Sequence, residues 1–264
     1  MTSSTELPLA PAVLTFNEEP NLRRTLESLR WAARVVVVDS GSTDATERIA
    51  RSFPNVEFFV RRFDCYQNQW RFAVSETGIT ADFVLALDAD MAATPAFVTE
   101  FEEEFLTGGF AGGLVPIQWC YFGKPLLRSF CPPQLRLFRR EAVQIAQPGH
   151  AQEFTVRGTV RSFTAGVWHE DRKSVERWLN SQANYSRQEE ERLRQQRALR
   201  PRDRLRGTGW MPAVAIFLSY WRAGGPFGGK RALRYAWERA TYESILAIRV
   251  LDQKLAEEEK ACQQ

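Results

Sequence analysis

Short apolar runs and amphipathic segments alternate along the first part of the chain. The runs are rich in β-branched residues, whereas the segments between them repeat apolar positions every three or four residues, a pattern typical of alternating strands and helices. We predict strands at 12–16, 34–39, 56–60 and 83–88, and helices at 19–31, 44–53, 67–75 and 94–106. Strands that alternate with helices favour a parallel sheet with right-handed crossovers.

Acidic residues stand where two of these strands end. Strand 34–39 ends in Asp39, and the polar segment 40–44 that follows contains a glycine for a tight turn and residues that can cap a helix. Strand 83–88 ends in Asp88, with Asp90 one residue beyond it. Parallel sheets bind ligands at the carboxyl ends of their strands, and carboxylates are preferred ligands of hard divalent cations. The pattern therefore indicates a nucleotide and metal site. A Rossmann dinucleotide site is disfavoured, because no G-x-G-x-x-G follows the first strand.

The middle of the chain, 108–164, is less regular. Short strands are predicted at 112–116, 119–123 and 135–138. We also expect a hairpin over 154–164, turning near 157–159.

Composition narrows the class of protein. The chain has 264 residues, of which 44% are hydrophobic and 25% charged, which fits one large domain or a domain with an appendage. Four cysteines without C-x-x-C spacing and two histidines argue against a zinc site or a disulfide framework and favour a reducing cytosol. We expect no signal peptide in residues 1–12, and no apolar run reaches the roughly 18 residues that a membrane span needs.

Several segments together resemble a known family. The segments 15–19, 38–44 and 87–90 are similar to the nucleotide-sugar-binding half of family 2 glycosyltransferases, and 69–73, 169–174 and 177–182 are similar to the branch with lipopolysaccharide core β-glucosyltransferases. The resemblance covers about 10–190, and more loosely the tail to about 250. It implies an α/β GT-A fold, the nucleotide-diphospho-sugar transferase fold with a Rossmann-like central sheet, followed by a helical C-terminal extension. The transferase domain would be 1–190, with a donor half at about 10–107 and an acceptor half at about 108–175, and the extension 191–264. One departure is Met91, where many members carry a third acid.

The resemblance also implies a donor site. Thr15, Asn17 and Glu18 would line the nucleoside pocket, and Asp39 would accept hydrogen bonds from the base. Asp88 would approach the ribose or the metal, while Asp90 would ligate Mg²⁺ or Mn²⁺ with His169 completing the coordination; for His169 a structural role is the alternative. Gln69 and Arg71 would lie beside the donor, and Arg71 has the alternative of being a solvated helix residue.

An inverting transferase needs a carboxylate that takes the proton of the acceptor hydroxyl. The candidates are Glu153, Glu170 and Asp171. We favour Asp171 because of its place in the segment 169–174, with Glu153 next. Capping of the helix that follows is the competing role for Asp171.

The C-terminal third differs in charge from the rest. Residues 192–239 contain twelve Lys or Arg and two acids, a net charge of +10, and they flank the apolar, aromatic segment 210–221. Basic residues beside tryptophan suit an anionic membrane surface, so we expect 200–239 to meet the cytoplasmic face of the inner membrane as a peripheral contact. The alternative is a pair of helices packed within the protein with a solvated arginine face. No nucleic-acid-binding module is recognisable, so nucleic acid is not an expected partner.

These observations predict a cytoplasmic, inverting glycosyltransferase that uses a divalent metal and a UDP-hexose, with glucose the expected sugar. The expected acceptor is lipopolysaccharide core or a lipid-linked saccharide. A polyprenyl-phosphate glycosyltransferase is the alternative within the same chemistry. A sugar-phosphate nucleotidyltransferase is disfavoured, because it would need a Gly- and Arg-rich phosphate loop after the first strand, and 15–18 is not such a loop. A non-catalytic membrane-surface module is disfavoured because Asp39, Asp88 and Asp90 occur together.

Overall fold

A seven-stranded sheet forms the centre of the first part of the chain, in a computed structural model that describes residues 7–147, 152–195 and 201–262. The strand order is β12-β6-β9-β4-β1-β2-β3. The strands are β1 (Leu9–Thr15), β2 (Val35–Asp39), β3 (Val56–Val60), β4 (Phe83–Asp88), β6 (Gly112–Val115), β9 (Gln134–Arg139) and β12 (Val160–Ser162). Strands β3, β2, β1 and β4 are parallel, as predicted, while β9 is antiparallel to both β4 and β6. The sheet is therefore parallel in its first half and mixed in its second.

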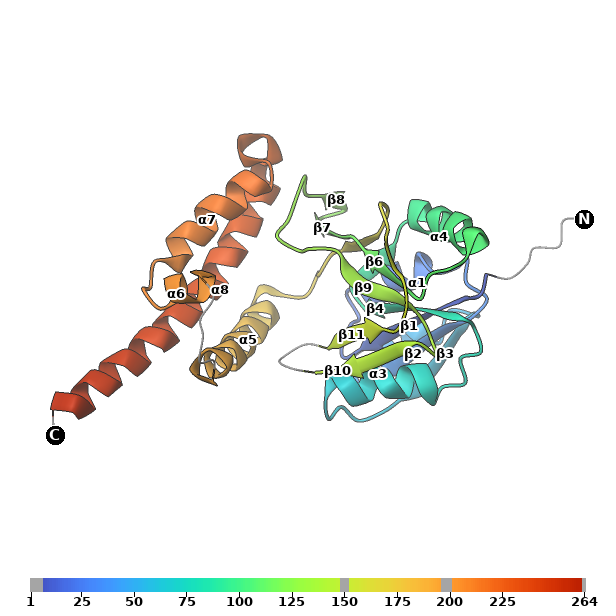
Figure 1. The fold of residues 1–264 in the computed structure, drawn as a ribbon, viewed down its shortest axis with the longest axis horizontal. Helices are drawn as coiled ribbons and strands as arrows, with labels where there is room; N and C mark the ends of the chain where they lie inside the picture. Colours follow the sequence, from blue (N-terminus) through green and yellow to red (C-terminus); the bar gives the residue numbers. More distant parts are fainter. Residues whose placement is uncertain (1–6, 148–151, 196–200, 263–264) are drawn as a thin grey trace, which may run out of the picture. The chain divides into compact units, whose positions relative to one another are not determined.

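Helices cover both faces of this sheet (Figure 1). Alternate side chains of a strand point to opposite faces, so Val35 and Val37 of β2 join one core cluster and Val36 and Val38 the other. The first cluster includes residues of α1 (Leu22–Glu27), α2 (Thr46–Ala50) and α4 (Pro95–Thr107). The second includes Trp70 of α3 (Tyr66–Ser75). Helices α1 and α2 are shorter than the sequence predicts, because turns replace helix at both ends.

Two smaller sheets complete this part. One has four strands in the order β5-β13-β7-β8, namely β5 (Met91–Ala93), β13 (Val167–His169), β7 (Ile117–Tyr121) and β8 (Lys124–Pro125). The other pairs β10 (Val143–Ala146) with β11 (Glu153–Val156). The predicted hairpin over 154–164 is wrong, because β11 pairs with β10, whereas β12 pairs with β6. Alternation of apolar residues identifies strands but does not determine their partners.

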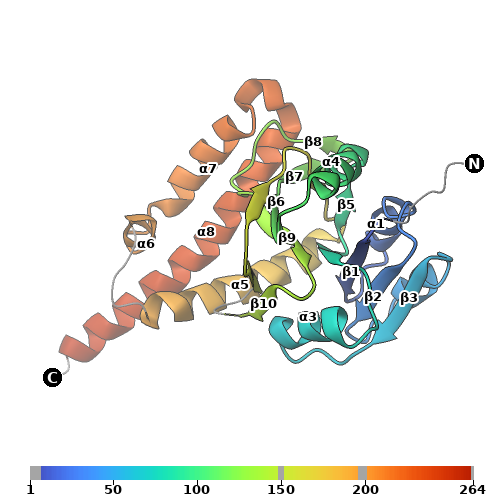
Figure 2. The same cartoon turned by 45° about the vertical axis from the view of Figure 1, so that its right-hand side comes forward.

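The rest of the chain is helical (Figure 2). Its helices are α5 (Val175–Gln195), α6 (Pro201–Arg206), α7 (Met211–Arg222) and α8 (Gly225–Cys262), and α8 has a kink at Gly229. Helices α7 and α8 pack together, and each carries small buried residues spaced four apart, which are Ala215 and Ser219 in α7, with Ala223 directly after it, and Ala232, Ala236 and Ala240 in α8. Among the described residues, no helix combines the length and apolar character that crossing a membrane requires.

The chain divides into two compact units. The sheet unit comprises the residues up to 125 together with 131–173, and the helical unit comprises 126–130 together with the residues from 174 onward. The boundary predicted at 190 lies inside α5, a continuous helix that belongs as a whole to the helical unit.

Buried ion pairs form part of the interior of the helical unit. Arg206 is 3% exposed, and its guanidinium donates to both carboxylate oxygens of Glu243, at 2.9 and 2.7 Å, and to Glu189. Arg202 also donates to Glu243, at 3.1 Å. Arg206 therefore cannot contribute to the lipid-facing surface that the sequence suggests for 200–239, and Arg200 lies outside the described residues.

Candidate functional site

The loops after β1 and β2 are held together by polar side chains. Asn17 adopts a left-handed backbone conformation, with φ 54°, that asparagine tolerates better than most residues. Its N–H donates to Ser42 Oγ at 2.6 Å, and its Oδ1 accepts from the Thr43 N–H at 2.7 Å. Thr15, the last residue of β1, is buried, and its Oγ1 has no hydrogen-bond partner among the described residues.

Asp39 is buried and organises the turn that follows it. Its Oδ2 accepts the N–H groups of Gly41 and Ser42, at 2.8 and 2.7 Å, and Ser42 Oγ donates to Oδ1. Gly41 has φ 94°, which an L-residue rarely adopts, so the glycine makes this turn possible. The carboxylate thus fixes the loop that follows β2 at this edge of the sheet.

Gln69 and Arg71 lie on different sides of α3. Gln69 is buried and braces the neighbouring loops, because its Nε2 donates to Ser40 Oγ at 3.2 Å and to the Arg61 carbonyl at 3.0 Å. Residues two apart on a helix point about 200° apart, so Arg71 is exposed, and it makes no hydrogen bond or ion pair within the described ranges. The structure does not bring these two predicted donor residues together.

Asp88 is paired with an arginine that sequence analysis missed. Arg136 of β9 donates to Asp88 Oδ2 at 3.0 Å and is itself 6% exposed. Its Nη1 is buried without a hydrogen-bond partner in the part of the chain that the structure describes. Arg136 interrupts the apolar run of β9, and a charged residue within a central strand is the signal that identifies it.

Asp90 lies in the turn between β4 and β5, where strand pairing brings a histidine beside it. Met91 of β5 is the register partner of His169 in β13. Consequently His169 Nε2 lies 3.4 Å from Asp90 Oδ2. Asp90 Oδ1 and His169 Nδ1 are buried and have no hydrogen-bond partner among the described residues. Met91, where related sequences often carry an acid, packs into the first core cluster and does not supply a polar atom.

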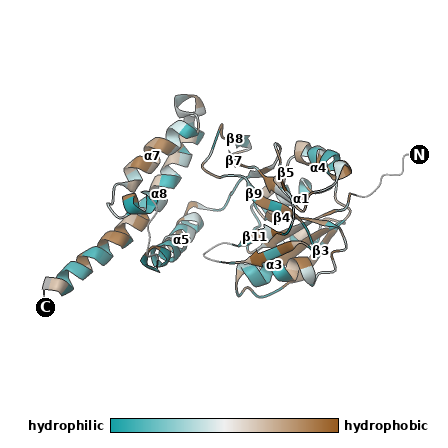
Figure 3. Ribbon diagram, in the orientation of Figure 1, coloured by the Kyte–Doolittle hydropathy of each residue, from teal (hydrophilic) through white to brown (hydrophobic). Residues whose placement is uncertain are grey.

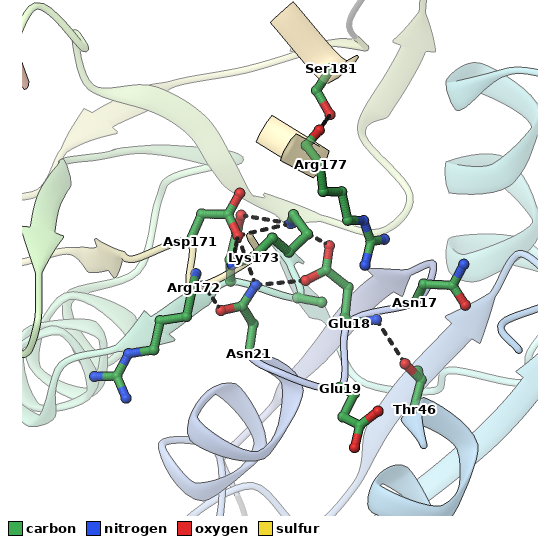
Figure 4. A network of polar contacts seen from close by, with 12 residues as sticks. Asn17, Glu18, Glu19, Asn21, Thr46, Asp171, Arg172, Lys173, Arg177 and Ser181 are labelled. Atoms are coloured by element: carbon green, nitrogen blue, oxygen red, sulfur yellow. Dashed lines mark hydrogen bonds and ion pairs between the residues drawn. The ribbon is translucent and has the colours of Figure 1, made fainter. Parts of the chain in front are cut away.

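Lys173 connects three carboxylates, and sequence analysis gave it no role. Its Nζ lies 2.7 Å from Glu18 Oε1, 3.1 Å from Asp171 Oδ1 and 3.9 Å from Asp90 Oδ2. Asn21 Nδ2 donates to Glu18 at 2.8 Å and to Asp171 at 3.0 Å. Figure 4 shows the side chains from the segment between β1 and α1 and those from the segment after β13 turned toward one another. We call Glu18, Asn21, Asp90, Asp171 and Lys173 the Lys173 cluster.

Burial and charge act in opposite directions on the groups of this cluster. Burial raises the pKa of Glu18 above its ordinary value, although Lys173 acts to lower it. Burial alone would lower the pKa of Lys173, but the neighbouring carboxylates of Asp90, Glu18 and Asp171 raise it well above its usual range. Lys173 is therefore a fixed positive charge at neutral pH.

The three candidate bases have different surroundings. Glu170 Oε1 accepts the Gly123 N–H and the Arg172 Nε–H, both at 3.0 Å. Despite burial, which raises it, these bonds and the charge of Arg24 keep the pKa of Glu170 below its ordinary value. The Glu170 carboxylate therefore holds together the loops after β7 and β13, which is a structural role. Glu153 is exposed at the start of β11, in a different sheet from the strand that precedes Asp171.

Asp171 belongs to the Lys173 cluster and remains partly accessible. Its Oδ1 accepts the Lys173 N–H at 3.0 Å, as well as the bond from Asn21. Burial acts to raise the pKa of Asp171, but the charge of Lys173 and these hydrogen bonds hold it below the ordinary value. Its side chain is 26% exposed, so one edge of the carboxylate is open to solvent.

The residues present fit a divalent cation only in part. No group of three or more His, Cys, Asp or Glu side chains among the described residues is arranged to enclose a metal. Asp90 Oδ1 is nevertheless a buried carboxylate oxygen that lacks a partner, and His169 Nε2 stands next to the same side chain. Mg²⁺ commonly takes one or two carboxylates and completes its coordination with phosphate and water. This donor set suits a cation that arrives together with a diphosphate.

The sequence belongs to glycosyl transferase family 2, whose model matches residues 12–162. The predicted family and the α/β fold with helices at the C-terminal end are thereby confirmed. A curated relative is the lipopolysaccharide core biosynthesis glycosyltransferase LpsC of Rhizobium meliloti (strain 1021), which is 33% identical over 89 residues. The matched segment covers 32% of this chain and 32% of LpsC, so the chain spans about a third of the length of that relative.

Solved structures of glycosyltransferases are similar at lower identity. TarS of S. aureus, solved with UDP-GlcNAc, is 13% identical, with 93% of this chain and 92% of that chain covered and a TM-score of 0.49. Glucosyl-3-phosphoglycerate synthase from Mycobacterium tuberculosis, solved with Mn²⁺, UDP and phosphoglyceric acid, is 17% identical, with 67% and 76% covered and a TM-score of 0.45. Similarity at this level does not identify the residues that bind a ligand in this chain.

Proposed function

We propose that this protein is an inverting, metal-dependent glycosyltransferase that transfers a hexose, with glucose the expected sugar, from a UDP-sugar to a saccharide acceptor of the lipopolysaccharide core type. Family membership and the curated relative support the reaction class. The observation that carries the proposal is the strand-end site. There Asp88 and Asp90 follow β4, and a buried Asp90 oxygen without a partner stands beside His169.

Two loops would bind the nucleoside. Thr15, Asn17 and Glu18 follow or end β1, and Asp39 ends β2, so all four belong to one edge of adjacent parallel strands. Asp39 fixes the turn in which Ser42 and Gly41 stand, and its exposed surroundings would receive the base. Gln69 would support this loop from behind through Ser40. Arg71 remains a weaker candidate, because its side chain lies on the opposite side of α3 from Gln69.

Asp90 and His169 would hold Mg²⁺ or Mn²⁺ together with the donor diphosphate. The bound cation would neutralise charge on the departing nucleoside diphosphate. Asp88 would reach the ribose or the metal, and Arg136 would hold its carboxylate in place through the bond at 3.0 Å. Arg136 Nη1 is a buried donor without a partner among the described residues, which costs free energy. A phosphate or ribose oxygen of the bound donor would accept its hydrogen bond.

Asp171 would act as the base that accepts the proton of the acceptor hydroxyl. Lys173 and Asn21 fix one of its oxygens, which leaves the partly exposed edge of the carboxylate for the acceptor. Glu170 is disfavoured, because Gly123 and Arg172 hold one of its oxygens and its side chain is only 6% exposed. Glu153 stays the second candidate.

The acceptor proposal rests on the name of the partial relative and on the motif resemblance. A lipid-linked saccharide or a polyprenyl phosphate is the alternative acceptor. Either acceptor would suit a protein located at the cytoplasmic face of the inner membrane.

The test is a transfer assay with the full chain. UDP-glucose would be incubated with lipopolysaccharide core oligosaccharide or with polyprenyl phosphate, in Mn²⁺ and in EDTA, while UDP release is followed and the product linkage is read by NMR. We expect metal-dependent UDP release, acceleration by the core oligosaccharide and a β-linked product. Release of UDP only with polyprenyl phosphate would move the acceptor to that class. Absence of metal-dependent release with every UDP-hexose tested would contradict the proposed function and favour a non-catalytic module.

A further inference from the structure

Helix α7 presents a stripe of large aromatic side chains to solvent. Trp210, Phe217 and Trp221 are 70%, 62% and 56% exposed. At about 100° per residue these three positions fall within roughly 40° of one another around the helix axis. The small residues Ala215, Ser219 and Ala223 occupy the opposite, buried side. Figure 3 colours part of α7 as hydrophobic. The exposed fractions show that the aromatic stripe is a face that the rest of the helical unit does not cover.

The start of α8, before its kink at Gly229, exposes another aromatic side chain. Phe227 is 95% exposed and stands in the sequence Gly224-Gly225-Pro226-Phe227-Gly228-Gly229. This segment is closely packed, because a Cβ atom on Gly228 would lie 2.5 Å from the Ala223 carbonyl oxygen. The backbone therefore requires glycine at 228, next to the exposed Phe227. A solvent-exposed phenylalanine in such a segment costs hydration free energy unless something covers it.

Charge indicates what covers this face. Residues 207–237 contain no Asp or Glu, whereas they contain four basic residues, which are Arg222, Lys230, Arg231 and Arg234. Tryptophan beside basic residues is the composition of helices that lie in the headgroup region of anionic bilayers. With 12 residues, α7 is about 18 Å long, which is much shorter than the hydrocarbon core of about 30 Å. Such a helix lies on a bilayer and does not cross it.

We propose that α7 with its N-cap and the start of α8, 210–230, bind the surface of an anionic lipid bilayer, with Trp210, Phe217, Trp221 and Phe227 at headgroup depth and Lys230 beside them. This surface is the central part of the segment 200–239 that the sequence suggests. The arginines before it contribute less than expected, because Arg206 is buried against Glu243 and Arg202 also donates to Glu243. The inference is independent of the proposed transfer reaction.

The experiment measures sedimentation of the full chain with vesicles of phosphatidylcholine, with or without phosphatidylglycerol, at low and high salt. We expect binding only to the anionic vesicles, and weakening by salt, since screening shortens the range of the attraction. Trp221→Ser combined with Phe227→Ser, and separately Lys230→Glu, should each weaken vesicle binding about tenfold or more. All these side chains are exposed, so circular dichroism and melting should stay as in the parent chain.

The matched control is Leu255→Ser. Leu255 is 62% exposed in the same unit but stands beside the acidic run 257–259, away from the proposed face in sequence, so vesicle binding should not change. Absence of binding to both kinds of vesicle, equal binding to both, or unchanged binding of the Trp221→Ser, Phe227→Ser variant would overturn the proposal. A concentration-dependent dimer that this variant abolishes, in place of lipid binding, would assign the face to a second copy of the chain.

Discussion

The substitution Asp90→Asn should abolish metal binding and leave the free energy of unfolding without metal almost unchanged. Asp90 is 9% exposed, and the attraction between its carboxylate and the Lys173 ammonium at 3.9 Å is about 4 kcal/mol at an effective dielectric constant of about 20. This attraction is opposed by the desolvation cost of a buried carboxylate, which is several kcal/mol. Oδ1 has no partner among the described residues, and asparagine keeps a polar atom at that position, so this cost of about 1–3 kcal/mol is the same in both chains. Lys173 also keeps Glu18 and Asp171 as partners. The terms nearly cancel, so we expect the free energy of unfolding without metal to change by no more than about 1–2 kcal/mol.

The rise in melting temperature that metal produces should change far more than the free energy of unfolding without metal. A ligand at about 100 times its dissociation constant stabilises the folded state by about 2.7 kcal/mol, which for a chain of this size raises the melting temperature by roughly 5–10 °C. We expect Mn²⁺ with UDP to produce a shift of this size in the parent chain and almost none in Asp90→Asn. Thermal unfolding with and without Mn²⁺, each with UDP, measures both quantities.

The matched control is Asp82→Asn, at the opposite end of β4. Asp82 is an exposed partner of Arg139 at 3.5 Å, so its replacement should leave the Mn²⁺ shift intact. A full Mn²⁺ shift in Asp90→Asn would show that Asp90 is not a metal ligand. Loss of about 4 kcal/mol of stability in the metal-free variant would instead make Asp90 a structural counter-ion of Lys173.

Three further outcomes are expected. Asp171→Asn should lower kcat about 100-fold with little change in the KM for the donor, while Glu153→Gln stays near the parent rate, and the reverse pattern in steady-state kinetics would transfer the role of base to Glu153. Arg206→Met should lower the free energy of unfolding by about 3–5 kcal/mol in urea titrations followed by circular dichroism, because it leaves buried carboxylates unpaired, and a loss below about 1 kcal/mol would contradict this. Burial raises the pKa of Glu189, but the Arg192 hydrogen bond and the charge of Arg206 lower it to about 2, so this group stabilises the fold above its ordinary pKa of 4.5. Its contribution should therefore fade as the pH drops from about 4.5 toward 2, visible as a falling urea midpoint that Glu189→Gln makes less steep.

The sequence predicted those features that follow from local pattern. Strands β1, β2 and β4 are nearly continuous apolar runs and β3 is rich in apolar residues, so the positions of these strands and their parallel direction could be inferred. The carboxyl ends of β2 and β4 brought Asp39 and Asp88 to one edge of the sheet. Family motifs then named the residues around them. Apolar periodicity did not determine pairing between distant strands, which is why the β11 and β12 partners were missed.

Ion pairs between residues far apart in the chain were also not predictable from the sequence. Lys173 and Glu18 are 155 residues apart in the chain, and Arg136 and Asp88 are 48 apart, so no local spacing reveals either contact. Charged residues are mostly exposed, and on that expectation Arg206 was assigned to a surface. Its burial depends on Glu243, which stands on a different helix and 37 residues away.

The Lys173 cluster and the cluster around Arg206 differ in net charge, and this difference indicates which of them has a binding role and which a structural one. In the helical unit, the carboxylates of Glu189, Asp203 and Glu243 lie beside the guanidinium groups of Arg192, Arg202, Arg206 and Arg239, so every carboxylate charge is offset. The Lys173 cluster contains three carboxylates and a single ammonium, which leaves two negative charges in excess if His169 is neutral. A buried excess of this kind is costly unless a cation offsets it. A divalent cation beside Asp90 would supply the missing charge, whereas the helical cluster has no need of one. The imbalance therefore favours a binding role for the Lys173 cluster and a structural role for the Arg206 cluster.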